Sequence, residues 1–249
     1  MAYLLASLLL FTAPAETAQA PVDDATRLVQ ANTAYDAGEY GKALETYKAL
    51  AERHGSGALY YNLGNAYLRT GHLGEAIAAY RRGQYLEPRN QDIRANLAFA
   101  RKSAGDALKP ATPSVIQRTL FFWHYALSPG ELLMGLLLFN VSFWLLWGLR
   151  LRFSASEILR WLSVATLLAT FLLGGSFLIH RFFPERAAVV TASQANIYSG
   201  TSTDTVVRFQ LHAGAEVSVV DRHDAWVRIR LPDGKDGWAE AEALDVLML

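Results

Sequence analysis

The sequence has no cysteine among its 249 residues and no excess of charge of either sign, with 23 Lys and Arg against 23 Asp and Glu. Without cysteine, disulfide bonds, thiol nucleophiles and cysteine-ligated metal sites are excluded. A protein that binds nucleic acid needs a clustered basic face, and the balanced charge gives no indication of one. We therefore expect no nucleic acid partner. The redox compartment stays open, because an oxidising space tolerates a chain without cysteine.

Sequence motifs of catalysis are also lacking. No two of the six histidines have the i, i+4 spacing that is typical of a zinc site on a helix. There is no glycine-rich phosphate loop and no Gly-x-Ser-x-Gly motif. We therefore predict a protein that is not an enzyme, with no catalytic residue, no metal ligand and no cofactor. The histidines are His54, His72, His124, His180, His212 and His223.

Apolar residues are concentrated in blocks, and the first block lies near the N-terminus. The run Ala2–Phe11 is apolar, and residues 18–20 (Ala-Gln-Ala) have the small-x-small form of a signal cleavage site. No Lys or Arg precedes the run, and Pro21 would hinder cleavage directly before it. We expect an export signal or an N-terminal anchor over residues 1–20. Cleavage after Ala15, and a short helix of the next domain, are the alternatives.

An internal repeat follows the first block. Gly71 follows Gly38 by 33 positions, and the same offset separates Tyr80 from Tyr47. Small residues let two helices approach closely, and aromatic residues fill the gap between neighbouring helices. This pattern resembles the tetratricopeptide repeat, a helix pair of about 34 residues. The resemblance implies an all-α solenoid over residues 22–108, with two repeats and a capping helix.

Tetratricopeptide-repeat domains bind peptides in a groove lined by the first helices of the repeats. In one subset of the family, asparagines and lysines clamp a C-terminal carboxylate, but Leu28 and Asp92 occupy the two lysine positions here. The resemblance therefore favours an internal peptide segment, because an asparagine amide can donate to and accept from a peptide backbone. The alternative is that these asparagines are solvated or capping residues. The candidate groove residues are Asn32, Asn62, Asn65 and Asn96.

Two long runs in the middle of the chain have no charged residue, at positions 132–149 and 161–179. At about 1.5 Å per helical residue, each run nearly crosses a hydrocarbon layer of about 30 Å. We predict transmembrane helices over residues 128–149 and 161–180. Asn140 and Ser142 are expected to face the second helix, because a polar group in hydrocarbon needs a partner.

The link between the two runs, residues 150–160, is basic. It holds Arg150, Arg152 and Arg160 against Glu157. By the positive-inside rule this loop is cytoplasmic, so both flanking domains lie on the other side of the membrane. Residues 109–127, before the first run, read as a linker followed by an interfacial segment.

The last third of the chain alternates apolar and polar residues between turn signals, which is typical of half-buried strands. The motifs at residues 196–200, 211–214, 226–229 and 233–238 resemble a bacterial SH3 (SH3b) domain over residues 187–249, although Tyr198 stands where the family usually has arginine. This domain holds nine acids against five bases, which favours a basic or neutral partner. The candidate surface residues are Tyr198, Trp226 and Trp238, although the two tryptophans could instead fill the barrel core.

The fold class predicted is a multi-domain membrane protein with an all-α tetratricopeptide-repeat solenoid, a transmembrane helical hairpin and a small all-β SH3-like barrel. This order of modules resembles the BatE proteins of the Bat (aerotolerance) operons. The resemblance implies a scaffold in the bacterial inner (cytoplasmic) membrane, with both outer domains in the periplasm. Its expected partners are membrane proteins with von Willebrand A domains and a MoxR-type ATPase system. Cell-wall (peptidoglycan peptide) sensing by the SH3b domain, and an unrecognised envelope enzyme, are the alternatives.

Overall fold

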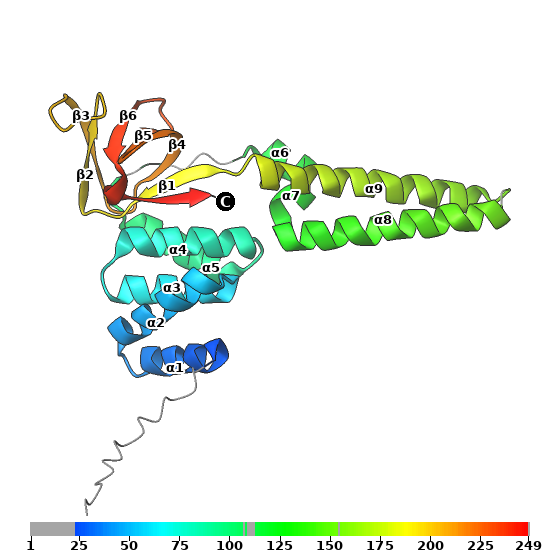
Figure 1. Ribbon diagram of the computed structural model, residues 1–249, viewed down its shortest axis with the longest axis horizontal. Helices are drawn as coiled ribbons and strands as arrows, with labels where there is room; N and C mark the ends of the chain where they lie inside the picture. Colours follow the sequence, from blue (N-terminus) through cyan, green and yellow to red (C-terminus); the bar gives the residue numbers. More distant parts are fainter. Residues whose placement is uncertain (1–22, 107, 109–112, 154, 249) are drawn as a thin grey trace, which may run out of the picture.

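The computed structural model describes residues 23–106, 108, 113–153 and 155–248. A long helical hairpin extends from a body that contains the helical repeats and the β domain (Figure 1). This architecture confirms the predicted fold class. The export signal or anchor expected over residues 1–20 lies outside the described residues.

The helical repeats occupy residues 24–103. Each repeat is a pair of antiparallel helices, and the turn inside each pair contains a glycine with a positive φ, 81° at Gly38 and 83° at Gly71. Glycine adopts this conformation without the steric cost that a Cβ would bring. The helices are α1 (Asp24–Asp36), α2 (Tyr40–Arg53), α3 (Gly57–Arg69), α4 (Leu73–Leu86) and α5 (Gln91–Ser103).

Two equivalent tyrosines fill the core of the repeats. Tyr47 on α2 is 1% exposed and Tyr80 on α4 is 0% exposed. A Cβ added at Gly64 would lie 2.5 Å from the ring of Tyr80, so only glycine lets α3 and α4 close over that ring. The 33-residue period of the sequence therefore marks equivalent packing positions in three dimensions.

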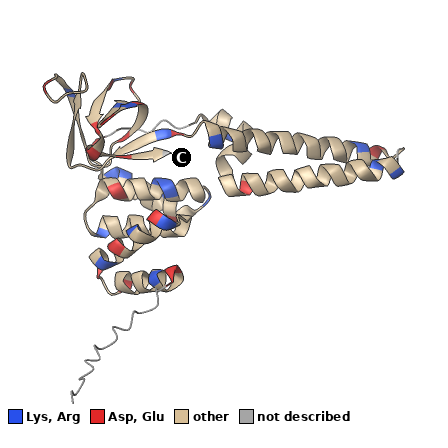
Figure 2. Ribbon diagram, in the orientation of Figure 1, with Lys and Arg blue, Asp and Glu red and all other residues tan. Residues whose placement is uncertain are grey.

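The hairpin consists of α8 (Pro129–Arg152) and α9 (Glu157–Phe182), and both helices are long and apolar enough to cross a membrane. A capping box at Ser128 begins α8. Charged residues gather at the two ends of the hairpin and leave its length free of charge (Figure 2). These features are compatible with a two-pass membrane protein.

Two details of the hairpin differ from the predictions. Both helices continue past their apolar runs, so Arg150, Arg152 and Arg160 lie on helical turns rather than in a loop. Asn140 is exposed instead of facing α9, so that prediction is wrong for this residue. The two helices approach closely where glycine of one lies against leucine of the other, as Gly135 does against Leu173. A larger amide does not fit such a close contact.

Between the repeats and the hairpin, α6 (Val115–Leu120) and α7 (Phe122–Ala126) form two short helical turns. Their apolar side chains point away from the body: Val115 is 80% exposed and Phe122 is 64% exposed. Exposed apolar residues beside the ends of two membrane-compatible helices are consistent with the interfacial segment predicted here.

The C-terminal domain is a seven-stranded antiparallel sheet in the order β3-β2-β6-β5-β4-β1-β7. Its inner face buries apolar side chains that alternate along the strands, such as Val227 and Ile229. The strands are β1 (Arg186–Val190), β2 (Gln194–Tyr198), β3 (Val207–His212), β4 (Glu216–His223), β5 (Trp226–Arg230), β6 (Asp236–Glu240) and β7 (Leu244–Met248).

The β domain packs directly on the repeats. Ala187, Val189 and Leu247 of β1 and β7 share one buried cluster with apolar residues of α4 and α5, among them Ile77. A Cβ added at Gly74 would lie 2.2 Å from the carbonyl oxygen of Val190, which is a backbone atom and cannot rotate away. The two domains therefore form one body with a continuous core.

Candidate functional site

The predicted groove asparagines lie in pairs on successive repeats. The side-chain nitrogen of Asn96 on α5 donates a hydrogen bond of 2.8 Å to Oδ1 of Asn65 on α3. The buried hydroxyl of Tyr80 donates to the same oxygen at 2.6 Å. Each Oδ1 can accept two hydrogen bonds, so this oxygen is fully used.

The same arrangement joins α1 of the first repeat to α3 of the second. Nδ2 of Asn62 donates to Oδ1 of Asn32 at 3.2 Å, and the hydroxyl of Tyr47 donates to that oxygen at 2.7 Å. Burial raises the pKa of Tyr47 to about 12, so its hydroxyl keeps its proton and remains a donor near pH 7. The structure thus brings the four asparagines together as two equivalent Asn–Tyr–Asn sets.

These bonds orient the amides. In the part of the chain that the structure describes, no hydrogen bond uses Nδ2 of Asn32 or Asn65, or Oδ1 of Asn62 or Asn96. Each pair therefore keeps one free amide donor group and one free amide acceptor. A peptide backbone offers one N–H and one C=O per residue, which is the complementary set.

Apolar residues lie on the same helical faces as the asparagines. Val29, three positions before Asn32, is 63% exposed, and Phe99, three positions after Asn96, is 64% exposed. Residues three apart on a helix are surface neighbours. This surface, formed by the two Asn–Tyr–Asn sets with Val29 and Phe99, is called the amide surface below.

A second candidate surface lies on the β domain. The inner-face alternation of β5 places Val227 and Ile229 in the core, so Trp226 points to the outer face and is only half-buried. Trp238 of β6 is likewise half-buried and outside the core cluster. The alternative that these tryptophans fill the barrel core is therefore wrong.

Tyr198 completes this outer face. Its ring meets that of Trp226 edge to face, with centroids 5.5 Å apart and planes at 88°, and its backbone pairs with that of Trp238. Edge-to-face contact is a preferred geometry for aromatic rings. The three candidates of this domain therefore lie together on strands β2, β5 and β6, with Tyr198 8% exposed beneath Trp226.

An acidic hollow borders the surface formed by Tyr198, Trp226 and Trp238, which is called the aromatic face below. A cavity of about 270 Å³ is lined by Asn196, Tyr198, Glu240 and Glu242 among others. The side-chain nitrogen of Asn196 lies 3.4 Å from the hydroxyl of Tyr198 and so closes one wall. Two carboxylates beside an aromatic ring suit a ligand with a positively charged amine.

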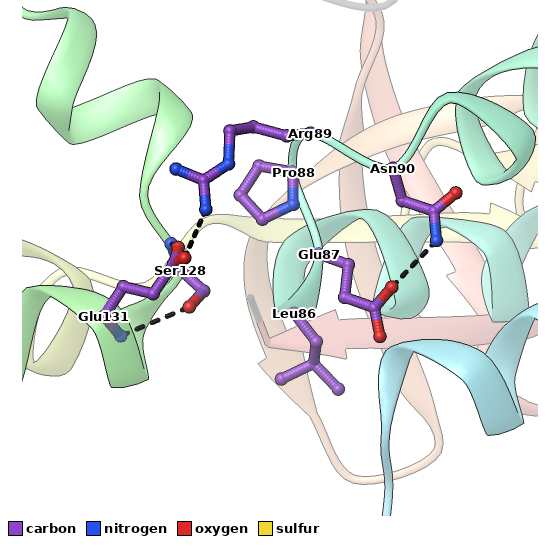
Figure 3. Close-up of a pocket in the computed structure, with 7 residues that line it drawn as sticks. All are labelled: Leu86, Glu87, Pro88, Arg89, Asn90, Ser128 and Glu131. Atoms are coloured by element: carbon purple, nitrogen blue, oxygen red, sulfur yellow. Dashed lines mark hydrogen bonds and ion pairs between the residues drawn. The ribbon is translucent and has the colours of Figure 1, made fainter.

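A third hollow lies where the repeats meet the hairpin. It has a volume of about 450 Å³ and is lined by the α4–α5 turn and the start of α8. Figure 3 shows Arg89 reaching from that turn to Glu131 of the α8 capping box, and Glu87 bonded to Asn90. The ion pair ties the repeats to the first turn of the hairpin. No local sequence pattern predicts this contact, because 42 positions separate the two residues.

Within the described ranges, no group of three or more His, Asp or Glu side chains is placed to hold a metal ion. One carboxylate near the outer face of the β domain is held in an ion pair. Arg228 donates to Asp236 at 2.6 Å, and this hydrogen bond lowers the pKa of the Asp236 carboxyl.

Comparison with known protein families agrees with the fold of the helical repeats and of the β domain. Residues 28–91 match the family model of the tetratricopeptide repeat, and residues 191–245 match that of the bacterial SH3 domain. No curated protein matches the chain. Tetratricopeptide repeats are protein–protein interaction modules and bacterial SH3 domains are associated with cell-wall binding; both are typically non-catalytic. The chain thus carries tetratricopeptide repeats and a bacterial SH3 domain, separated in sequence by two helices that are compatible with a membrane.

Proposed function

We propose that this protein is a non-enzymatic, membrane-anchored adaptor that holds an extended segment of a protein partner on the amide surface. The observation that carries the proposal is the pair of Asn–Tyr–Asn sets, each of which leaves one free amide donor group and one free amide acceptor. Buried tyrosine hydroxyls hold these amides in position, so a bound peptide loses little free energy in ordering them.

The proposed orientation places the repeats and the SH3b domain in the periplasm, with the tip of the hairpin in the cytoplasm of a bacterial inner membrane. Arg150, Arg152 and Arg160 at that tip support it through the positive-inside rule. Since the chain has no cysteine, single cysteines at Ala155 and Ser193 would report topology on a clean background. An impermeant maleimide is expected to label Ser193→Cys in spheroplasts and Ala155→Cys only after lysis.

The proposed partners are membrane proteins with von Willebrand A domains and the MoxR-type ATPase system of Bat operons, as the module order suggests. The test is affinity capture from detergent-solubilised membranes. Asn62→Ala with Asn96→Ala removes the free amide acceptor of each set. Both tyrosine hydroxyls keep their hydrogen bonds, because these go to Asn32 and Asn65. We expect recovery of an A-domain protein to fall at least tenfold, and Gln30→Ala, an exposed amide on α1, to leave it unchanged.

The same capture contradicts the proposal if the double variant recovers the partner as well as the wild type does. Deleting the repeats is a poorer experiment. The deletion would expose Ala187, Val189 and Leu247, which the repeats cover, and apolar surface exposed in this way promotes non-specific association.

A second candidate function is binding of peptidoglycan peptides by the SH3b domain. The aromatic face with Glu240 and Glu242 beside it favours a peptide that carries a free amine. Co-sedimentation of the full chain with purified sacculi tests it. Trp226→Ala is expected to abolish sedimentation, while Trp144→Ala on the hairpin serves as a matched control. Equal sedimentation of both variants would exclude the aromatic face as the binding site.

A further inference from the structure

A cationic cavity of about 490 Å³ lies where α4 and α5 of the repeats, the α6–α7 segment and the end of α9 meet. Figure 1 places this junction at the end of the hairpin that joins the body. Its charged lining holds four arginines against one carboxylate. The charged and imidazole residues that line it are Arg81, Arg94, Arg101, Arg118, His124, His180 and Glu185.

Two of the four arginines are neutralised and two are not. Arg81 pairs with Glu185 at 2.7 Å, and Arg101 pairs with Glu216 at 2.5 Å. Over the described ranges, neither Arg94 on α5 nor Arg118 on α6 has an ion-pair partner. The cavity therefore presents two uncompensated guanidinium groups, supplied by two different elements.

Two buried polar atoms of the lining also lack a hydrogen bond: Nε of Arg81 and Nδ1 of His124. Nε of Arg81 lies 3.4 Å from a Glu216 oxygen without the alignment of a hydrogen bond. Buried polar atoms without partners are rare. Since Nε of Arg81 already faces the Glu216 carboxylate, Nδ1 of His124 is the buried atom of the lining that is left for a ligand. Burial and the neighbouring His180 lower the pKa of His124, so at pH 7 its ring is neutral and carries one N–H.

Most of the remaining lining is apolar or aromatic, with Leu97, Pro113 and Leu127 among the residues, and Gln84 adds one amide. The α6–α7 segment beside it exposes Val115 and Phe122 to the outside. A ligand that fits this cavity therefore combines an anionic group with an apolar portion. Arginine binds phosphate through two parallel hydrogen bonds, and basic pockets beside membrane helices bind lipid headgroups.

We propose that this cavity binds the phosphate headgroup of an anionic phospholipid from the adjoining leaflet, with Arg94 and Arg118 as its principal contacts. The bound lipid would join α5, α6 and the end of α9 and so fix the body relative to the membrane. The proposal rests on the membrane insertion included in the proposed function, and is independent of the identity of any protein partner.

The test is lipid binding by the full chain, purified in a neutral detergent. Dioleoylphosphatidylglycerol, dioleoylphosphatidylcholine and inorganic phosphate are titrated separately, with bound lipid counted by native mass spectrometry. We expect phosphatidylglycerol to bind at least tenfold more tightly than either of the others. Arg94→Ala with Arg118→Ala should weaken its binding at least tenfold, and the matching lysine variants should keep part of the affinity.

The control is Arg222→Ala with Arg230→Ala, which removes the same charge from exposed positions of the β domain. Equal binding of phosphatidylglycerol to the cavity variant and the wild type would overturn the site, and so would equal binding of phosphatidylcholine. Binding of inorganic phosphate as tight as that of the lipid would overturn the lipid as the occupant. Membrane fractionation distinguishes failure of the proposed function from failure of this inference. A chain found in the soluble fraction contradicts the proposed function. A membrane-bound chain without lipid specificity contradicts only this inference.

Discussion

Arg101 of α5 and Glu216 of β4 form a two-point ion pair across 115 positions of sequence, with Nε–Oε1 at 2.5 Å and the second guanidinium nitrogen at 2.8 Å from Oε2. Glu216 is 9% exposed, so these contacts take the place of the water that would surround an exposed carboxylate. The pair joins the last helix of the repeats to the barrel, alongside Arg82 and Asp245, which also meet at two points.

The Arg101–Glu216 pair predicts the effect of Glu216→Gln. Glutamine keeps the shape of the side chain but leaves Arg101 half-buried without a counter-charge. Losing hydrogen bonds between charged groups costs about 2 kcal/mol, or about 5 °C in melting temperature for a domain of this size. Thermal unfolding of the full chain checks this. Glu240→Gln, an exposed acid of the same domain, should leave the melting temperature unchanged.

The close contact at Gly74 predicts opposite effects of two glycine substitutions. Gly74→Ala drives a Cβ into the carbonyl of Val190 and should separate the barrel from the repeats. Gly41→Ala has open space around it on α2, so it should stabilise that helix by about 0.5–1 kcal/mol. Limited proteolysis between the domains, together with thermal unfolding, distinguishes the two. Equal protease resistance of the Gly74 variant and the wild type would show that the two domains are not held by this contact.

The Asn–Tyr–Asn sets predict unequal effects of two asparagine substitutions. Asn65→Ala leaves the buried hydroxyl of Tyr80 without its acceptor and should cost about 1–3 kcal/mol of stability. Asn96→Ala leaves that bond in place and should cost less than about 1 kcal/mol. Denaturant unfolding measures both. Tyr80→Phe added to Asn65→Ala should recover part of the loss, since no unpaired hydroxyl remains, and a strictly additive loss would contradict this arrangement.

Alkaline pH should destabilise the repeats through Tyr47. Burial raises its pKa from the usual 10.0 to about 12, so the folded state releases this proton later than the unfolded state does. Its contribution to stability is complete below about pH 10. It is then lost as the pH rises towards 12, at about 1.4 kcal/mol per pH unit. Unfolding free energies measured across this range give the slope. Burial also raises the pKa of Tyr80, so Tyr47→Phe should reduce the slope by the share of one group, and an unchanged slope would assign the pH dependence to the other tyrosines.

Much of the architecture was predictable from local patterns. The repeat is recognisable because both copies have the same residue types at equivalent packing positions: Gly38 and Gly71 in the turns, Tyr47 and Tyr80 in the core. The apolar runs predict α8 and α9 because a charge-free stretch of this length is long enough to cross a hydrocarbon layer as a helix. The alternation around Trp226 predicts a strand, but could not assign the outer face, because either face of an isolated strand can be the buried one.

Four features could be predicted from local patterns: the order of modules, the repeat period, the membrane-compatible helices and the residue types of both candidate surfaces. These follow from periodicity and composition, which act over a few turns or strands. Tertiary packing, by contrast, brings the asparagines into pairs held by buried tyrosines and joins the barrel and the repeats in one core. It also places arginines from α4, α5 and α6 around one cavity. The physical reason is that these relationships join residues far apart in the chain, and no local pattern encodes which distant surfaces will pack together.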